Sequence, residues 1–185
     1  DWCKTNNTKL VYSGSSSKHH NPYQSPYALY KYLGEELCKM YKKVYNMEIE
    51  VARFYNVYGP REITDGDWAA VIGIWRRQIK DQKPLTIVGD GEQRRDFTHV
   101  YDIVDGLIKI SQSKISHEDA WELGSGKNYS INEVFEMFKN KFNCSFENIP
   151  DQKGNYRVTL RKHSDALNLL KWEPQDRLEK YIKSL

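Results

Sequence analysis

The 185-residue chain contains little cysteine and no long apolar run. Its three cysteines, Cys3, Cys38 and Cys144, are odd in number, lie far apart and form no C-x-x-C pair. This pattern excludes a disulfide-rich scaffold, assigns the cysteines to packing and predicts a reduced, cytoplasmic setting. No stretch approaches the roughly 20 apolar residues that a membrane-spanning helix needs, and no secretory apolar segment follows Asp1. We therefore expect no membrane partner.

The sequence also lacks a strong excess of one charge. The formal net charge is +3, and the Lys and Arg residues are scattered along the chain. So mild and dispersed a charge does not predict a nucleic-acid surface, although it suits a small anionic ligand. Hydrophobic residues make up 39% of the chain without low-complexity blocks or internal repeats, which is typical of a folded globular protein.

What the sequence does contain is an alternation of strand-like and helix-like stretches. KLVYSGSSS (9–17) predicts a strand that opens into a loop at its Gly and Ser, and IEVARFYNVYGP (49–60) predicts a strand ended by a Gly-Pro turn. Further predicted strands are LTIVG (85–89), AWELG (120–124) and RVTLR (157–161). Helical patterns lie between them, including 69–81, 101–113 and DALNLL (165–170). Strands that alternate with helices predict an α/β protein built on a parallel sheet.

Serines mark three of the predicted helix starts. Ser25 is a good N-cap for the helix that begins at Pro26. Ser130 and Glu133 have the spacing of a capping box. Ser164 is the predicted cap of the DALNLL helix.

The helix after Ser25 contains both an apolar stripe and a polar pair. The stripe consists of Leu29, Leu33, Leu37, Met40 and Val44, and its helical spacing predicts a buried face. Gly34 is unfavourable inside a helix, which suggests that another helix approaches closely there. Tyr27 and Lys31 lie one turn apart beside the stripe. Because about one Tyr-x-x-x-Lys match is expected by chance in this composition, the spacing alone fits a surface pair as well as a proton-transfer pair.

Six sequence stretches help to interpret the Tyr27–Lys31 pair. They are LVYSGSSS, SPYALYKYLGEE, ARFYNVYGPRE, GDGEQRRDFTHVYDIVDG, WELGSGKNYSINEV and LLKWEP. Their order and spacing over almost the whole chain resemble the NAD-dependent epimerase/dehydratase family, the extended short-chain dehydrogenases that act on nucleotide sugars. The resemblance implies NAD as cofactor. It also implies the C-terminal part of a Rossmann-type doubly wound parallel sheet, followed by a smaller α/β substrate-binding domain.

The resemblance covers only the latter part of that fold. Residues 1–62 correspond to the C-terminal part of the NAD-binding domain, and residues 63–185 mainly to the substrate-binding domain, with some segments that return to the Rossmann sheet. The glycine-rich fingerprint that binds the cofactor pyrophosphate in such folds is not in the sequence. We therefore expect the chain to be a C-terminal fragment, or a natural half, of such an enzyme.

The family motif implies a catalytic set. Tyr27 is expected to move a proton on a sugar hydroxyl, with Ser15, or Ser16 as second choice, hydrogen-bonded to the substrate. A free phenol has a pKa near 10, so this chemistry needs a nearby cation, which Lys31 supplies. Tyr27, Lys31 and Phe54 are also expected to contact the cofactor.

The resemblance further implies contacts with the nucleotide. They are Asn56 and Arg95 at the diphosphate, Thr86 and Val88 at the base, and Ser16 at the sugar. A guanidinium suits paired oxyanions because it donates two parallel hydrogen bonds. Where the family often has a second phosphate-binding Arg before Gly-Asp, this chain reads DQKGNYR, so Lys153 or Arg157 is a candidate substitute.

The loop after the strand-end serines bears on the reaction. Related 4,6-dehydratases have an Asp-Glu pair there, and the related 3,5-epimerase/reductases have a Cys after the serines and a His after the Gly-Pro turn. This chain has SSKHH in the loop, with Ser17 and Arg61 at the latter two positions. His19 and His20 fit either acid–base work or a shortened polar loop, and they lack partners for a metal site.

These departures favour a 4-epimerase of a UDP-sugar such as UDP-glucose. A 4,6-dehydratase or reductase of the same family remains an alternative, as does a non-catalytic module that binds nucleotide sugars or dimerises. Family members commonly dimerise through the Tyr-bearing helix, so we expect a homodimer.

Overall fold

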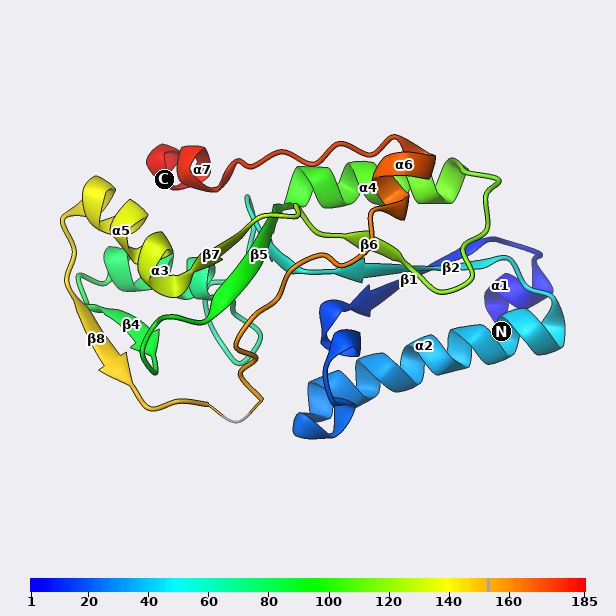
Figure 1. Ribbon diagram of the computed structural model, residues 1–185, viewed down its shortest axis with the longest axis horizontal. Helices are drawn as coiled ribbons and strands as arrows, with labels where there is room; N and C mark the ends of the chain where they lie inside the picture. The colour runs from blue at the N-terminus through cyan, green and yellow to red at the C-terminus, as the bar shows by residue number, and fades with distance from the viewer. Residues whose placement is uncertain (153) are drawn as a thin grey trace.

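The computed structural model describes residues 1–152 and 154–185 (Figure 1). The helices are α1 (Trp2–Thr5), α2 (Pro26–Tyr45), α3 (Val71–Lys80), α4 (Val100–Gln112), α5 (Ile131–Phe142), α6 (Asp165–Leu170) and α7 (Leu178–Ser184), with 3-10 turns η1 (Ser16–His19) and η2 (Pro22–Gln24). The strands are β1 (Leu10–Ser15), β2 (Ile49–Phe54), β3 (Asn56–Tyr58), β4 (Leu85–Val88), β5 (Arg94–His99), β6 (Trp121–Leu123), β7 (Asn128–Ser130) and β8 (Phe146–Ile149). Within the described residues, no helix combines the length and the apolar character needed to cross a membrane.

The first sheet is parallel and has the strand order β1-β2-β6. Figure 1 shows α2 on one face of this sheet and α4 on the other. Cys38 of α2 packs against Val51 of β2, whereas Ile103 of α4 packs against Trp121 of β6. Parallel strands with a helix on each face confirm the predicted α/β fold.

The second part of the molecule contains two smaller sheets around one apolar core. β3 pairs in parallel with β5, β7 pairs antiparallel with β5, and β4 pairs in parallel with β8. The core includes the fully buried Trp75 and Phe138, whose rings meet edge to face at 5.3 Å. The strand predicted at 157–161 is wrong in extent, because only a single bridge between Val158 and Arg94 forms there.

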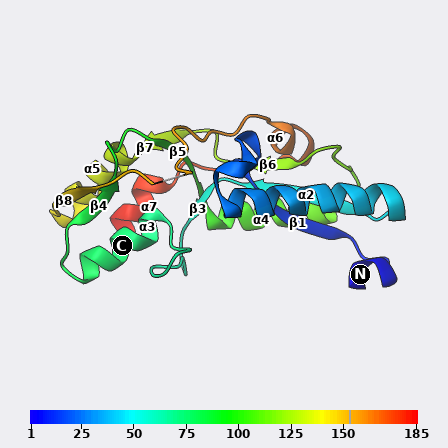
Figure 2. The same ribbon diagram turned by 90° about the horizontal axis from the view of Figure 1, so that it is seen from below.

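One extended run connects the two parts. The sequence predicts a single strand over 49–60, but the structure divides it into β2 and β3 with only Tyr55 between them. β2 pairs with strands of the first sheet, and β3 pairs with β5 of the second part. The two parts therefore lie end to end, with the N-terminus in the first part and the C-terminus in the second (Figure 2).

Two of the three predicted serine caps are confirmed. The Ser25 hydroxyl accepts a hydrogen bond of 3.1 Å from the backbone N–H of Ala28. Ser130 and Glu133 form the reciprocal capping box at the start of α5. The prediction for Ser164 is wrong: its side chain caps no N–H of α6, because its backbone is not in the extended conformation that directs a cap toward the helix.

The predicted burial of the α2 stripe is wrong. Leu33, Leu37, Met40 and Val44 are 46%, 57%, 39% and 62% exposed. The face of α2 that packs on the sheet instead buries Glu35 and Cys38. The close approach at Gly34 exists, but it is made by the Tyr12 side chain of β1 rather than by a helix, and a Cβ at this position would overlap the phenol.

Candidate active site

A cavity of about 310 Å³ opens beyond the carboxyl ends of β1 and β2. The structure brings seven of the predicted site residues to its wall: Ser15, Ser16, Tyr27, Lys31, Phe54, Asn56 and Arg95. They come from η1, from α2 and from the four strands β1, β2, β3 and β5. Ligands of open α/β sheets bind at this edge, so the predicted residues converge where the fold favours a site.

Tyr27 and Lys31 lie in the first two turns of α2. The Lys31 ammonium donates a hydrogen bond of 2.9 Å to the Ser13 carbonyl oxygen of β1 and lies 5.9 Å from the centre of the Tyr27 ring. The Tyr27 side chain is 45% exposed and so is accessible to a ligand in the cavity. A tethered cation beside an accessible phenol is the arrangement that proton transfer by a tyrosine requires.

The strand-end serine is held by its own loop. Ser15 is buried at the end of β1, and its hydroxyl oxygen accepts from the backbone N–H of Ser17 at 3.2 Å and from the Ser17 hydroxyl at 3.0 Å. Because both bonds use the oxygen as an acceptor, the Ser15 hydrogen remains able to donate into the cavity. The geometry therefore suits a hydrogen bond from Ser15 to a substrate oxygen.

A second cavity of about 200 Å³ adjoins the first. Thr86 and Val88 line it, and Asn56 and Arg95 line both cavities. The Asn56 amide donates to the Asp96 carbonyl oxygen at 3.2 Å and to the Thr159 hydroxyl at 3.0 Å. Since both amide hydrogens are used inside the protein, this rotamer offers none to a diphosphate.

Arg95 is the cation shared by the two cavities. Its guanidinium donates to the Arg94 carbonyl oxygen at 2.9 Å and to the Asn155 side-chain oxygen. No carboxylate of the described residues pairs with it, and burial lowers the pKa of Arg95. A desolvated cation without a counter-ion is costly unless an anion binds, so Arg95 marks a place for an anionic ligand.

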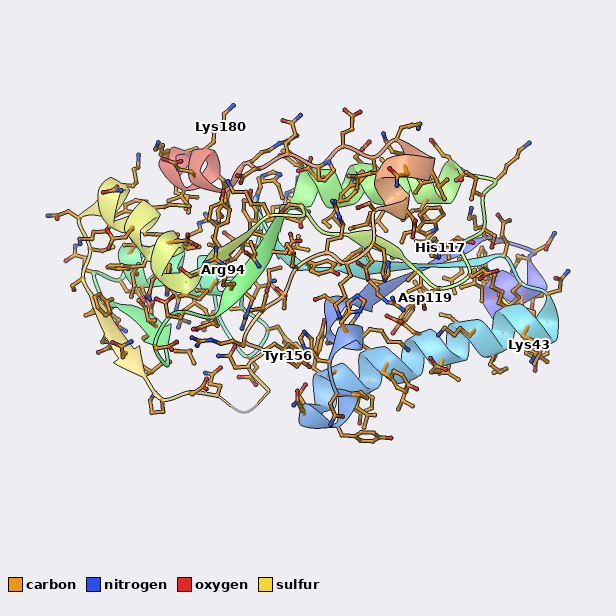
Figure 3. The ribbon with its side chains drawn as sticks, viewed as in Figure 1. Lys43, Arg94, His117, Asp119, Tyr156 and Lys180 are labelled. Atoms are coloured by element: carbon orange, nitrogen blue, oxygen red, sulfur yellow. The ribbon has the colours of Figure 1, made fainter. Side chains whose placement is uncertain are left out.

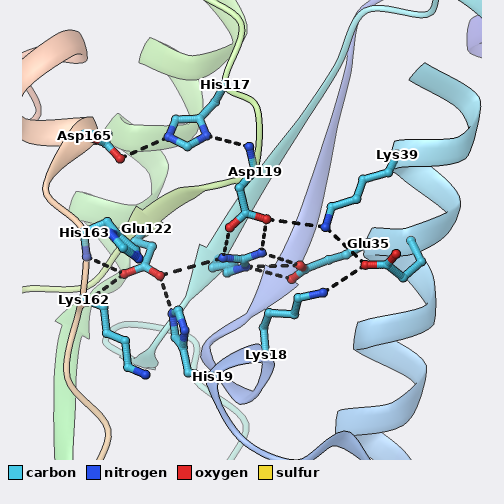
Figure 4. Close-up of polar contacts among 12 residues, drawn as sticks. Lys18, His19, Glu35, Lys39, His117, Asp119, Glu122, Lys162, His163 and Asp165 are labelled. Atoms are coloured by element: carbon cyan, nitrogen blue, oxygen red, sulfur yellow. Dashed lines mark hydrogen bonds and ion pairs between the residues drawn. The ribbon is translucent and has the colours of Figure 1, made fainter. Parts of the chain in front are cut away.

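Behind the first cavity lies a buried network of charges that sequence reasoning missed (Figure 4). Arg53 of β2 pairs with Glu35 of α2 at 2.8 Å and with Asp119 at 2.6 Å. Glu122 of β6 accepts from the Tyr55 hydroxyl at 2.9 Å. The sequence signals for this network were Glu35 on the sheet-facing side of α2 and Arg53 within β2. A buried charge needs a partner of opposite charge, so these two residues could have been paired from the sequence.

His19 belongs to this network. Its ring contacts the Glu122 carboxylate, which also accepts from the backbone N–H groups of Lys162 and His163 at 2.8 and 2.9 Å. Burial alone would raise the pKa of Glu122, but the contacts with His19 and the two N–H groups outweigh it and lower the pKa to about 2. The geometry places His19 in a structural contact that ties the serine loop to β6.

Two further candidates, His20 and Arg157, do not line either cavity. His20 stacks on the Tyr156 ring. Arg157 already forms a two-point ion pair with Asp90 at 2.8 and 3.0 Å. Lys153 lies outside the described residues. Arg95 is thus the candidate phosphate ligand that lines the cavities without a carboxylate partner among the residues that the structure describes.

Known proteins are similar to this chain in sequence and in architecture. The model of the NAD dependent epimerase/dehydratase family matches residues 1–124. A putative UDP-glucose 4-epimerase of Methanocaldococcus jannaschii is 36% identical over 164 residues, which cover 86% of this chain and 51% of that protein. A UDP-glucuronate 4-epimerase of Thermodesulfobacterium geofontis is 34% identical over 186 residues, which cover 95% of this chain and 55% of that protein. The chain thus spans about half the length of these curated relatives.

Solved structures agree with the fold. The UDP-N-acetylglucosamine 4-epimerase of Methanobrevibacter ruminantium, in complex with UDP-N-acetylmuramic acid, matches 98% of this chain and 63% of its own with a TM-score of 0.87 and 28% identity. The UDP-glucuronic acid 4-epimerase of Bacillus cereus, in complex with UDP-glucuronic acid and NAD, matches 98% of this chain and 61% of its own with a TM-score of 0.86 and 26% identity.

Proposed function

Because the chain belongs to the NAD-dependent epimerase/dehydratase family, we propose that the whole protein is a nucleotide-sugar 4-epimerase that uses tightly bound NAD on a UDP-sugar such as UDP-glucose. The observation that carries the proposal is the cavity lined by Ser15, Tyr27, Lys31 and Arg95, of which Arg95 has no carboxylate partner among the described residues. Relatives named as UDP-sugar 4-epimerases support the choice of reaction.

The residues present fit one end of the cofactor. Lys31 and Tyr27 offer a cation and a phenol to the hydroxyls of a nicotinamide ribose, and Phe54 lines the same cavity. When bound, NAD supplies the oxidising and reducing power for reversible oxidation of the sugar at C4. No glycine-rich turn for the pyrophosphate occurs in residues 1–185. We therefore expect this chain alone to bind NAD weakly or not at all and to turn over no nucleotide sugar.

Three side chains carry the proton chemistry. Tyr27 takes the proton of the C4 hydroxyl during oxidation and returns it during reduction. Lys31, held by the Ser13 carbonyl oxygen, favours the phenolate form of Tyr27 that accepts this proton. Ser15 donates its free hydrogen to the C4 oxygen and so holds the oxygen against Tyr27. The same set serves both faces of the sugar, because the sugar rotates while the proton acceptor stays in place.

The nucleotide lies in the second cavity in this proposal. Arg95 binds the diphosphate, and Thr86 and Val88 line the space for the base. Asn56 either changes rotamer to reach the diphosphate or acts indirectly by holding the Thr159 hydroxyl. Residues 1–62 then form mainly the cofactor side and residues 63–185 mainly the nucleotide side, with β6 returning to the first sheet.

Turnover tests the proposal. The whole protein with NAD and UDP-glucose is expected to yield UDP-galactose, which proton NMR distinguishes at the anomeric signal. A 4-keto-6-deoxy product would instead identify a dehydratase. Binding of UDP-glucose without any conversion would make the protein a nucleotide-sugar-binding module.

We also propose a cytoplasmic homodimer. All three cysteines are free thiols, which suits a reducing compartment. The exposed apolar stripe on α2, described above, suits a second copy of the same helix. Sedimentation of the whole protein at micromolar concentration should show a dimer, and Leu37→Asp should convert it to a monomer. If the protein without substitutions sediments as a monomer, the proposed dimer is wrong.

A further inference from the structure

Trp68 belongs to the loop between β3 and α3 and is the most exposed of the five tryptophans. Its side chain is 74% exposed, although an indole is among the side chains that gain most from burial. Exposure alone means little, because single apolar residues are common on protein surfaces and Trp2 is 69% exposed. What distinguishes Trp68 is its place beside the proposed proton-transfer residue.

The Trp68 ring is next to the ring of Tyr27. The two ring centres are 6.3 Å apart, and the ring planes are tilted by 56°. Tyr27 lines the first cavity, whereas Ala70 and Val71, two and three residues after Trp68, line the second. Trp68 therefore lies at the border of the two cavities, on the side where the 45% exposed Tyr27 meets solvent.

The loop holds Trp68 by contacts on both sides of it in the chain. The Asp65 carboxylate accepts a hydrogen bond of 2.7 Å from the Gly66 N–H and also pairs with Arg77 of α3. The Ala69 N–H donates to the Gly66 carbonyl oxygen at 3.1 Å and so closes a turn that contains Trp68. A turn fixed on a helix presents its aromatic ring to a ligand with little loss of conformational entropy.

Another wall of the first cavity comes from the segment of Tyr156. Tyr156 lines this cavity, and Figure 3 shows it near the first turns of α2. A Cβ on Gly154 would lie 3.2 Å from the Ser25 side chain, so this segment packs against the start of α2. Trp68 reaches Tyr27 from a different loop. It adds an aromatic surface next to a cavity whose strand-end serines and lysine are polar.

We propose that Trp68 contacts the glycosyl group of the nucleotide sugar, with its indole packed on the C–H face of the sugar while Tyr27 acts on a hydroxyl. This inference rests on the proposed function. A pyranose has hydroxyls at its edge and C–H groups on its faces, so an aromatic ring beside a hydrogen-bonding tyrosine matches both kinds of surface. In the proposed function the diphosphate lies at Arg95 and the base at Thr86, whereas Tyr27 lines only the first cavity of the two. The sugar is therefore the part of the ligand that meets Trp68.

Fluorine NMR tests the contact directly. The 185-residue chain labelled with 5-fluorotryptophan gives one signal for each of its five tryptophans, and Trp68→Phe and Trp2→Phe identify two of them. UDP-glucose is expected to shift the Trp68 signal saturably, whereas UDP alone should leave it in place. Trp2 is the matched control, because Lys4 of its helix contacts Tyr45 at the far end of α2 from Tyr27. The Trp2 signal should move with neither ligand.

Affinities measure the size of the contact. Trp68→Ala removes the indole from an exposed position, so the fold should be little affected. It is expected to weaken binding of UDP-glucose by about 3- to 10-fold, the worth of one aromatic contact, and to leave binding of UDP unchanged. Titrations followed by ¹⁵N–¹H NMR measure these dissociation constants into the millimolar range. Trp2→Ala should change neither constant.

Two results would overturn the inference while the proposed function stands. One is a Trp68 signal that responds equally to UDP and to UDP-glucose. The other is an unchanged affinity for UDP-glucose in Trp68→Ala. If the chain without substitutions binds UDP no better than it binds free glucose, the proposed nucleotide site itself fails, and the inference fails with it.

Discussion

The two walls of the active-site cavity are supported in opposite ways. Behind Ser15 and Tyr27 lie buried charges, with Arg53 between Glu35 and Asp119. Behind Arg95 lies an apolar core that contains Trp75 and Phe138. Buried ion pairs add little net stability but fix orientation, whereas apolar burial supplies stability directly.

This difference suggests a division of work. In the proposed function, the charged wall carries the groups that must be oriented for proton transfer, and the apolar wall carries the surface that would hold the nucleotide. Substitutions on the two walls should therefore separate turnover from binding. The following experiments test that separation, from the largest expected effect to the smallest.

Tyr27→Phe tests the charged wall most directly. Removing a general acid–base group is expected to lower kcat of the whole protein by roughly 10² to 10⁴, with KM for the nucleotide sugar little changed. Tyr30→Phe is the control, because Tyr30 lies in the same helix three residues after Tyr27 and is 73% exposed. Lys31→Met is expected to lower NAD affinity as well as kcat. Unaltered turnover in Tyr27→Phe would remove this tyrosine from the mechanism.

Arg53→Met tests the network behind that wall. Arg53 lies 2.8 Å from Glu35 and 3.9 Å from Glu122, both of which are buried. The variant removes the cation that these two carboxylates share, which should reduce the free energy of unfolding by about 3–5 kcal/mol. Urea denaturation followed by circular dichroism measures it. Arg77→Met, at a partly exposed pair with Asp65, should change stability little. A variant of Arg53 as stable as the unchanged chain would show that the network is not needed for folding.

Arg95→Met tests the apolar wall. Loss of charge-assisted hydrogen bonds should weaken UDP binding by about 10- to 100-fold, and Tyr27→Phe should leave UDP binding unchanged. Arg157→Met removes a neighbouring cation that already pairs with Asp90, so it controls for the general loss of charge. Equal effects of the Arg95 and Arg157 variants would show that the attraction is not specific to Arg95.

Acidification should affect the charged wall in a defined direction. The pKa of Glu122 is lowered to about 2 in the folded protein, below the value near 4.3 of a free glutamate. Its stabilising effect is therefore complete above about pH 5 and is lost as the pH falls toward 2. Unfolding midpoints measured from pH 7 to pH 2.5 should fall less steeply in Glu122→Gln than in the unchanged chain. Parallel curves would assign the acid sensitivity to other carboxylates.

Local patterns in the sequence predicted much of this arrangement. The helix from Pro26, the strand that ends in Ser15 and the Tyr27–Lys31 spacing all follow from residues close together in the chain. Contacts between distant residues were not predictable. His19 meets Glu122 across 103 positions, and only the folded sheet brings them together. The same limitation explains why the burial of the α2 stripe was predicted wrongly. Periodicity shows that a helix has two different faces, but it does not show which face packs on the sheet.

The single residue between β2 and β3 has a mechanical consequence. Enzymes that close by hinge motion use several flexible loop residues to absorb the rotation. Here the joint is Tyr55, which is buried and hydrogen-bonded through its hydroxyl to Glu122. Such a joint is stiff, so the spacing between the two walls is set during folding and not by the arriving ligand. The conformational entropy lost in bringing the two walls together is therefore lost when the chain folds. It does not reduce the affinity of the site for its ligand.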